Sequence, residues 1–151
     1  MNWTKKGVIY APSGESNWAM HSALTPSPIY INPDTIRVYA GFRDQKGVSR
    51  IGFVDVSATD PSAVKRVSET PVLDIGIDGA FDDNGVILGD VVRKDGLLYM
   101  YYVGFQLVQK AKFLAFTGLA ISDDNGDSFT KVSTAPIMDR QDEGLTIHDW
   151  C

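Results

Sequence analysis

Short apolar runs alternate with residues that favour turns along the whole chain. The predicted strands are residues 27–31, 36–42, 48–55 and 64–67 in the first half, and residues 90–93, 99–105, 116–122 and 129–132 in the second half. Val, Ile, Tyr, Phe and Thr dominate these runs, whereas Gly, Pro, Asn and Asp separate them, which is typical of β-strands and turns. No window shows the periodicity and caps of an amphipathic helix. The pattern predicts an all-β chain.

The two halves of the chain repeat one another. Tyr39-Ala40-Gly41-Phe42 aligns with Tyr102-Val103-Gly104-Phe105 at an offset of 63 residues (102 − 39), Gly52 with Gly118 at 66 (118 − 52), and Pro71-Val72-Leu73-Asp74 with Pro136-Ile137-Met138-Asp139 at 65 (136 − 71). Small insertions in loops account for the drift of the offset, because loops tolerate them. The repeat therefore has four predicted strands, of which the fourth is short and more polar.

Each repeat has the features of one β-propeller blade. Turn residues, Pro33-Asp34 in the first repeat and Asp95-Gly96 in the second, join the first strand to the second. We predict a single partial propeller domain over residues 1–151: two four-stranded antiparallel blades at about 20–75 and 80–139, and the start of a third at 140–151. We expect the inner strands to be buried between neighbouring blades and the outer strand to face solvent. One β-sandwich of about eight strands is the alternative, and the repeat favours blades.

Charge and composition narrow the range of partners. The net charge is −5 and the isoelectric point about 4.8, which argues against nucleic acid or an anionic membrane as partner. The first seven residues lack the apolar core of a signal peptide, so we expect a cytoplasmic location. With one cysteine, Cys151, and two histidines, His21 and His148, we expect no intrachain disulfide, no metal site and no cofactor.

Several segments carry a resemblance to a group of enzymes. They are His21 with Pro26-Ser27-Pro28, Arg43-Asp44, and the segments 79–86, 99–104 and 118–126. Through them the sequence resembles the five-bladed β-propeller glycosidases of glycoside hydrolase families 43, 32, 68, 117 and 130, and more closely their uncharacterised bacterial relatives. The resemblance covers nearly the whole chain but only about the N-terminal half of such a propeller. It implies a glycosidase-like protein whose partner is a carbohydrate.

In these enzymes the active site is a funnel on the propeller axis, lined by the starts of the innermost strands. Cleavage needs two carboxyl groups, one as proton donor and one as nucleophile or base. The resemblance makes Asp83, Asp82 and Glu143 the candidate catalytic residues. Adjacent strand residues point to opposite faces, so we expect one of the two aspartates, Asp83, to face the funnel. Family 43 enzymes have an aspartate where this chain has Ser22, so the usual base is absent or supplied elsewhere.

Four other residues are candidates for binding the sugar. They are His21, Arg43, Asp44 and Trp18. The planar guanidinium of Arg43 suits sugar hydroxyls or a substrate carboxylate, and Trp18 suits stacking on a sugar ring. Each has a structural alternative: a strand-capping turn for the Asp82-Asp83 pair, a surface ion pair for Arg43 and Asp44, a loop hydrogen bond for His21, and packing between blades for Trp18.

Three functions remain open at this point. The first is a glycosidase-like protein, or an N-terminal fragment of one, that acts on or binds a carbohydrate. The second is a non-catalytic carbohydrate-binding or oligomeric assembly module without hydrolase activity. The third is a truncated product whose exposed strand edges pair with other chains. Two blades do not close a ring of ~4–8 blades, so we expect either a homo-oligomer or a fragment of a longer chain.

Overall fold

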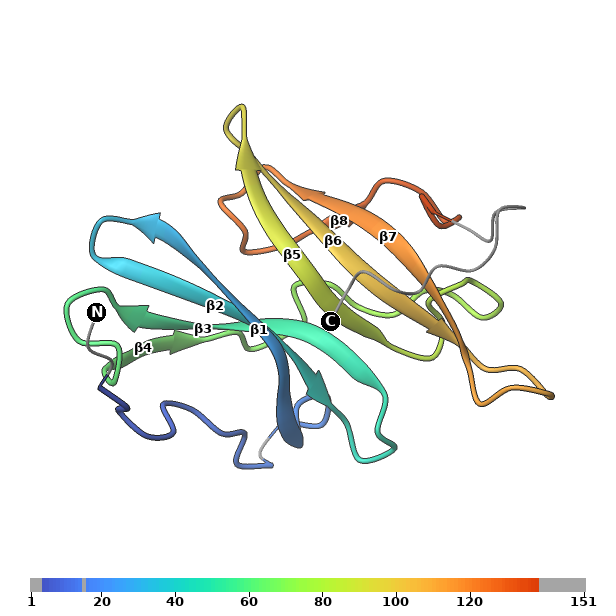
Figure 1. The fold of residues 1–151 in the computed structure, drawn as a ribbon, viewed down its shortest axis with the longest axis horizontal. Coiled ribbons are helices and arrows are strands. Elements are labelled where there is room, and N and C mark those ends of the chain that lie inside the picture. Colours follow the sequence, from blue (N-terminus) through green and yellow to red (C-terminus); the bar gives the residue numbers. More distant parts are fainter. Residues whose placement is uncertain (1–3, 15, 139–151) are drawn as a thin grey trace.

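The computed structural model describes residues 4–14 and 16–138, which form two separate antiparallel sheets (Figure 1). The strands of the first sheet are β1 (His21–Asn32), β2 (Thr35–Arg43), β3 (Ser49–Ser57) and β4 (Val64–Val67). Those of the second sheet are β5 (Val86–Lys94), β6 (Leu97–Gln106), β7 (Leu114–Ser122) and β8 (Thr130–Lys131). Each sheet keeps its strands in chain order, so we call β1–β4 blade one and β5–β8 blade two. Among the described residues, no helix is long and apolar enough to cross a membrane.

The all-β prediction and the two four-stranded antiparallel sheets are confirmed. The first hairpin of each blade, β1–β2 and β5–β6, turns where the sequence predicts. Asp95 and Gly96 have φ of +51° and +83°, which is the conformation that a two-residue turn matching the strand twist requires. In the first hairpin the Asn32 side chain instead accepts a hydrogen bond of 2.9 Å from the backbone N–H of Asp34.

The strand register corrects one part of the repeat alignment. Ala40 pairs with Gly52 in blade one, and Tyr102 pairs with Gly118 in blade two. Ala40 and Tyr102 are therefore equivalent, at an offset of 62 (102 − 40), and the motif match of Tyr39 with Tyr102 is out of register by one residue. A slip of one residue moves a side chain to the opposite face of a sheet. The first hairpin of each blade gives the same offset independently, because Thr35 pairs with Asn32 as Leu97 pairs with Lys94 (97 − 35 = 62), so the offset of 66 between the two glycines is confirmed.

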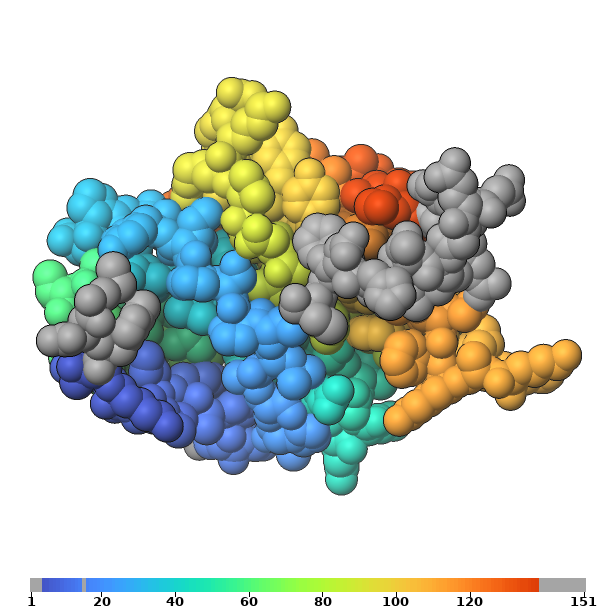
Figure 2. Space-filling model, in the orientation of Figure 1, coloured from blue at the N-terminus to red at the C-terminus, as the bar shows by residue number. Residues whose placement is uncertain are grey.

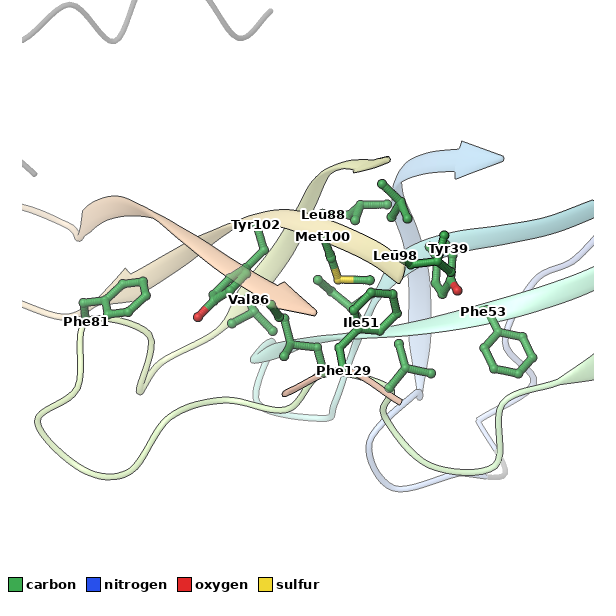
Figure 3. Packing of buried hydrophobic residues seen from close by; sticks show 14 residues of the cluster. Tyr39, Ile51, Phe53, Phe81, Val86, Leu88, Leu98, Met100, Tyr102 and Phe129 are labelled. Carbon is green, nitrogen blue, oxygen red and sulfur yellow. The ribbon is translucent and has the colours of Figure 1, made fainter. Parts of the chain in front are cut away.

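The core lies between the two blades (Figure 3). Blade one contributes Tyr39, Ile51 and Phe53, together with Val72 and Leu73. Blade two, with the loop before β5 and the connection between β7 and β8, contributes Phe81, Val86, Leu88, Val91, Leu98, Met100, Tyr102, Ala120 and Phe129. A smaller cluster covers the other face of blade one, where the segment before β1 packs on Ala40, Phe42, Val54 and Val56. Blade one is thus apolar on both faces, as a sheet covered on both sides must be.

The expected burial of the inner strands is wrong for β1. It alternates between exposed and half-buried positions and has no buried residue, whereas β2 and β3 are largely buried. In the space-filling view β1 lies open on the surface (Figure 2). The apolar run at 27–31 predicts a covered strand, but apolar composition does not determine burial, which depends on whether another part of the protein packs against the strand. The fourth strand, β4, is mainly exposed, as expected.

Ion pairs connect the two blades at the end where the β1–β2 hairpin turns. Arg37 on β2 is 2 % exposed and donates to both carboxylate oxygens of Asp55 on β3, at 2.7 and 2.8 Å. It also donates to Asp127 in the β7–β8 turn at 2.7 Å, and Arg66 on β4 pairs with the same two carboxylates. Burial opposes the charge of Arg37, yet Asp55 raises its pKa above the ordinary value. The network therefore keeps a buried cation fully charged and ties blade two to blade one.

Candidate functional site

At the opposite end of both blades, where β1 and β5 begin, backbone hydrogen bonds join the start of the first strand to the end of the second. Before β1, the N–H of Met20 donates to the carbonyl of Arg43 at 2.8 Å. Before β5, the N–H of Asn84 donates to the carbonyl of Phe105 at 2.9 Å. The Ser49 hydroxyl, at the start of β3, donates to the carbonyl of Val86 at 2.8 Å and so joins the two blades. We call this end the strand-start rim.

His21 and Arg43 lie opposite each other at the rim, as a cross-strand pair of β1 and β2. Both are exposed. Nδ1 of His21 lies 2.8 Å from the hydroxyl of Ser22, whereas the guanidinium of Arg43 donates no hydrogen bond to any residue among those described. Two of the predicted binding residues are thus brought together, and both are exposed.

The backbone of β1 is strained next to this pair. Ser22 and Thr25 have φ of +70° and +44°, in the left-handed region that favours glycine, and the register of β1 shifts at the same place. Such conformations cost roughly 1–3 kcal/mol each and cluster at functional sites. The strain directs the first residues of β1 away from a regular strand path.

Asp44 has a structural role at the end of β2. Its carboxylate accepts hydrogen bonds from the N–H groups of Lys46 and Val48, at 2.8 and 3.0 Å, and from Arg50 at 2.9 Å. Burial opposes ionisation, but these hydrogen bonds lower the pKa of Asp44 below its ordinary value. The residue is therefore ionised near neutral pH and is unsuited to donate a proton.

Two residues at this end were missed in the sequence. Arg50 on β3 holds Asp44 on one side and Asp74 on the other, at 2.9 and 2.7 Å. The Asp74 side chain is 61 % exposed, so one carboxylate of this group faces solvent. The Pro-x-x-Asp motif, which occurs at 71–74 and again at 136–139, is the sequence signal that marks Asp74.

Asp82 and Asp83 lie in a turn before β5, not in the strand itself. Asp82 is 1 % exposed; its carboxylate accepts a hydrogen bond from the Tyr102 hydroxyl at 3.0 Å and pairs with Lys131 at 2.6 Å. Burial, and then the Asp82 charge, raise the pKa of Tyr102 well above its ordinary value. Both contacts are made by Oδ2, and the paired Lys131 places a positive charge beside this buried carboxylate.

Asp83 is the more accessible member of the pair. It is half-buried, and its carboxylate accepts one hydrogen bond, from the N–H of Gly79 at 2.9 Å. We expected strand alternation to direct Asp82 and Asp83 to opposite faces, but the two residues lie in a turn, and the turn gives their side chains different surroundings. A catalytic role for Asp83 or Asp82 stays a prediction, and Glu143 lies outside the described residues.

Trp18 packs on the face of blade one that points away from blade two. Its indole N–H donates to the carbonyl of Glu69 at 3.0 Å, and its ring meets Phe42 edge-on at 5.7 Å. Trp18 also lines a cavity of about 330 Å³ between the N-terminal segment and blade one, with Tyr10, Ser13, Ser16, Ala19, Phe42, Val67, Ser68 and Glu69. The structure therefore does not bring Trp18 together with the cross-strand pair of His21 and Arg43.

No family model matches this sequence. Two uncharacterised proteins from Mycobacterium tuberculosis, one from strain CDC 1551 and one from strain H37Rv, are each 35 % identical to it over 152 aligned positions. The alignment covers 99 % of this chain but 50 % of each relative. The chain therefore spans about half the length of these relatives.

Similar solved structures are glycoside hydrolases. A glycosyl hydrolase from Bacteroides ovatus has a TM-score of 0.67 and 20 % identity over 97 % of this chain and 44 % of its own. A family 117 glycoside hydrolase from Zobellia galactanivorans has a TM-score of 0.64 and 19 % identity, over 85 % and 37 %. A structure from the GH130 family of mannoside phosphorylases, described as containing hydrolases of β-1,2 mannosidic linkages in Candida mannan, has a TM-score of 0.66 and 19 % identity, over 97 % and 44 %. The chain thus has the fold of part of a propeller-type glycosidase, as its sequence predicted.

Proposed function

We propose that the chain provides part of a carbohydrate-processing site at the strand-start rim. In this proposal the Arg43 guanidinium and the His21 ring bind sugar hydroxyls, and Asp83 is a catalytic carboxylate. The observation that carries it is the combination of a glycosidase-type fold with an exposed cation at the start of the inner hairpin that has no protein acceptor among the described residues. An arginine that structure alone required would be paired, as Arg37 and Arg50 are.

Glycosidic cleavage needs a second carboxyl group on the other side of the scissile bond. Asp82 and Asp44 do not suit this task, because Lys131 and Arg50 respectively neutralise them. Glu143 remains our prediction for the second carboxylate.

A non-catalytic carbohydrate-binding module is the second candidate. It is favoured by the engagement of Asp82 and Asp44, which leaves Asp83 as the accessible carboxylate among the predicted catalytic residues that the structure describes. A module of this kind would keep the sugar contacts of Arg43 and lack turnover. The two candidates therefore differ in the role of Asp83 and agree in the role of Arg43.

The test is a screen of aryl-glycosides for hydrolysis and of free oligosaccharides for binding by calorimetry, repeated with Arg43→Gln and Asp83→Asn. For the enzyme, Asp83→Asn abolishes turnover with the melting temperature unchanged, and Arg43→Gln weakens binding about tenfold or more. The control Asp78→Asn removes an exposed carboxylate from the same loop and leaves both properties unchanged. Binding that survives in Asp83→Asn without turnover in either protein supports the module. If no glycan binds, or if Arg43→Gln binds as the native chain does, the proposal is wrong.

A further inference from the structure

The first strands of the two blades, β1 and β5, are irregular at the same place. The register shifts immediately before Ser27 in β1 and immediately before Asp90 in β5, where each strand has one more residue than its partner. Ser27 pairs with Tyr39 and Asp90 with Tyr101, which are equivalent at the offset of 62 (101 − 39), so Ser27 and Asp90 occupy equivalent positions. Such β-bulges re-aim a side chain and are frequent next to active sites.

The inserted residue of β5 is Gly89, and only glycine fits there. A Cβ at this position would lie 2.9 Å from the carbonyl oxygen of Tyr101 on the partner strand, so a larger residue would force the backbone to shift. Directly after the bulge, the Asp90 carboxylate accepts a hydrogen bond of 2.8 Å from the N–H of Val91 and one of 3.2 Å from the Ser27 hydroxyl. Two equivalent side chains thus meet across the two blades.

One oxygen of the Asp90 carboxylate is left for a ligand. Both hydrogen bonds are accepted by Oδ1, whereas Oδ2 has no partner among the residues that the structure describes. The carboxylates of Asp44, Asp55 and Asp82, in contrast, each pair with an arginine or a lysine. Asp90 is exposed, and β1 and β5 lie next to each other on the face that Figure 2 shows. An oxygen that accepts hydrogen bonds therefore faces solvent between these two strands.

Asp90 lies too far from Asp83 to form a cleaving pair with it. Asn84, the neighbour of Asp83, is hydrogen-bonded to Phe105, and Asp90 pairs with Tyr101 on the same strand, β6. Because a strand rises about 3.3 Å per residue, the four residues from Tyr101 to Phe105 correspond to about 13 Å. The two carboxyl groups of a glycosidase are at most about 9.5 Å apart. Asp90 therefore suits binding and not bond cleavage, at a distance that one sugar ring does not span.

We infer that Asp90, together with the Ser27 hydroxyl, binds hydroxyl groups of a second sugar unit, so that the ligand is an oligosaccharide lying along β1 and β5 from the strand-start rim inward. This inference rests on the proposed function, in which Arg43 binds the sugar unit at the rim. The second unit donates hydroxyl hydrogens to Oδ2 of Asp90, and a hydrogen bond to a carboxylate is stronger than one between neutral groups. The substrate class is thus a chain of sugars and not a monosaccharide derivative.

The experiment measures binding of the mono-, di- and trisaccharides of glucose, mannose, galactose and xylose by calorimetry, with the native chain and with Asp90→Asn. Asparagine keeps the size of the side chain and an acceptor for the N–H of Val91, but it lacks the charge. Asp90→Asn should weaken binding of the di- and trisaccharide about tenfold or more, and of the monosaccharide by less than about twofold. Arg43→Gln should weaken all three. The matched control Asp95→Asn removes an exposed carboxylate from the other end of β5 and leaves every affinity unchanged.

Two results would overturn this inference and leave the proposed function intact. One is an Asp90→Asn variant that binds all sugars as the native chain does, while Arg43→Gln weakens them; the other is an equal loss for mono- and trisaccharides. Absence of binding by every sugar overturns the proposed function and the inference together. The melting temperature of Asp90→Asn should match that of the native chain. If it does not, Ser27→Ala decides, because it removes the hydroxyl without changing Asp90, and it should weaken the longer sugars selectively.

Discussion

Blade one and blade two have a glycine at the same point of the third strand, and they cover it in different ways. Gly52 lies under the indole of Trp18, a residue from the segment before the sheet. Gly118 lies under the ring of Tyr102, a residue of the neighbouring strand, whose hydroxyl reaches the buried Asp82. The backbone repeat thus preserves a space, while the side chain that fills it depends on what each blade meets next.

The faces of the two blades differ in charge as well as in packing. Towards blade two, blade one presents a buried arginine and an aspartate around an aromatic centre, and the Arg37 guanidinium lies 3.7 Å over the Phe53 ring. The corresponding face of blade two has only apolar and aromatic residues at these positions. The comparison teaches that the same repeat can present a charged face in one blade and an apolar face at the equivalent positions of the other. Four predictions, each with a second variant, test how the two blades differ.

The largest effect is expected from Arg37→Met, which leaves the carboxylates of Asp55 and Asp127 without their buried partner. Breaking a buried pair in this way costs about 3–5 kcal/mol of unfolding free energy. Arg66→Met is the control, because Arg66 pairs with the same carboxylates but its side chain is 50 % exposed, and its loss should cost about 1 kcal/mol or less. Urea unfolding measures both. Equal costs would show that the network does not depend on burial.

Leu73→Ala should cost about 2–5 kcal/mol, because it removes a side chain that is 2 % exposed from the core between the blades. The equivalent change in blade two, Met138→Ala, should cost less than about 0.5 kcal/mol, since that side chain is half in solvent. The same unfolding experiment gives both values. A cost at Met138 that approaches the cost at Leu73 would mean that the two faces are equally covered.

Gly118→Ala should cost about 1–3 kcal/mol, since a Cβ there would overlap the Tyr102 ring. Phe81 stacks on that ring at 6.0 Å, and Asp82 holds its hydroxyl, so the ring has no room to withdraw. Adding Tyr102→Leu should make the two effects less than additive by at least about 0.5 kcal/mol. Strict additivity in a double-mutant cycle would show that another contact limits this glycine.

The sequence predicted the architecture well because strand patterns and turn residues are local. The Asp95-Gly96 turn and the Gly52–Gly118 match needed only the chain itself. The register of the second strands was wrong by one residue, because Tyr39 and Tyr102 both stand two residues before a glycine in a similar motif, and a motif does not record which face a side chain takes. Only the pairing of Ala40 with Gly52 and of Tyr102 with Gly118 settles it.

The candidate site was predicted less completely, because it depends on distant partners. The sequence placed His21 and Arg43 at the two ends of the first hairpin, and the structure pairs them across its strands, whereas their role in binding stays a prediction. The ion pair of Asp82 with Lys131 joins residues 49 positions apart (131 − 82), and no feature of the sequence near either residue predicts it. Which carboxylate is free to react is decided by such long-range pairs and not by the motif that contains it.

The smallest effect concerns the β3–β4 and β7–β8 turns, each of which has an aspartate bound to a serine two or four residues later. Burial opposes ionisation of Asp124, but hydrogen bonds of 2.6 Å from Ser122 and Ser128 lower its pKa to about 2. Because the folded pKa lies below the ordinary value of 3.8, the stabilisation is present above about pH 4 and is lost as the pH falls towards 2. The native chain should thus be more stable than Asp124→Asn by at most about 1 kcal/mol at pH 7, and the gap should close between pH 4 and 2.

Asp60→Asn, in the equivalent and more open turn of blade one, should show a smaller gap over the same window in urea unfolding at stepped pH. A gap for Asp124→Asn that stays constant from pH 7 to 2 would assign the turn's stability to its backbone and not to the carboxylate charge.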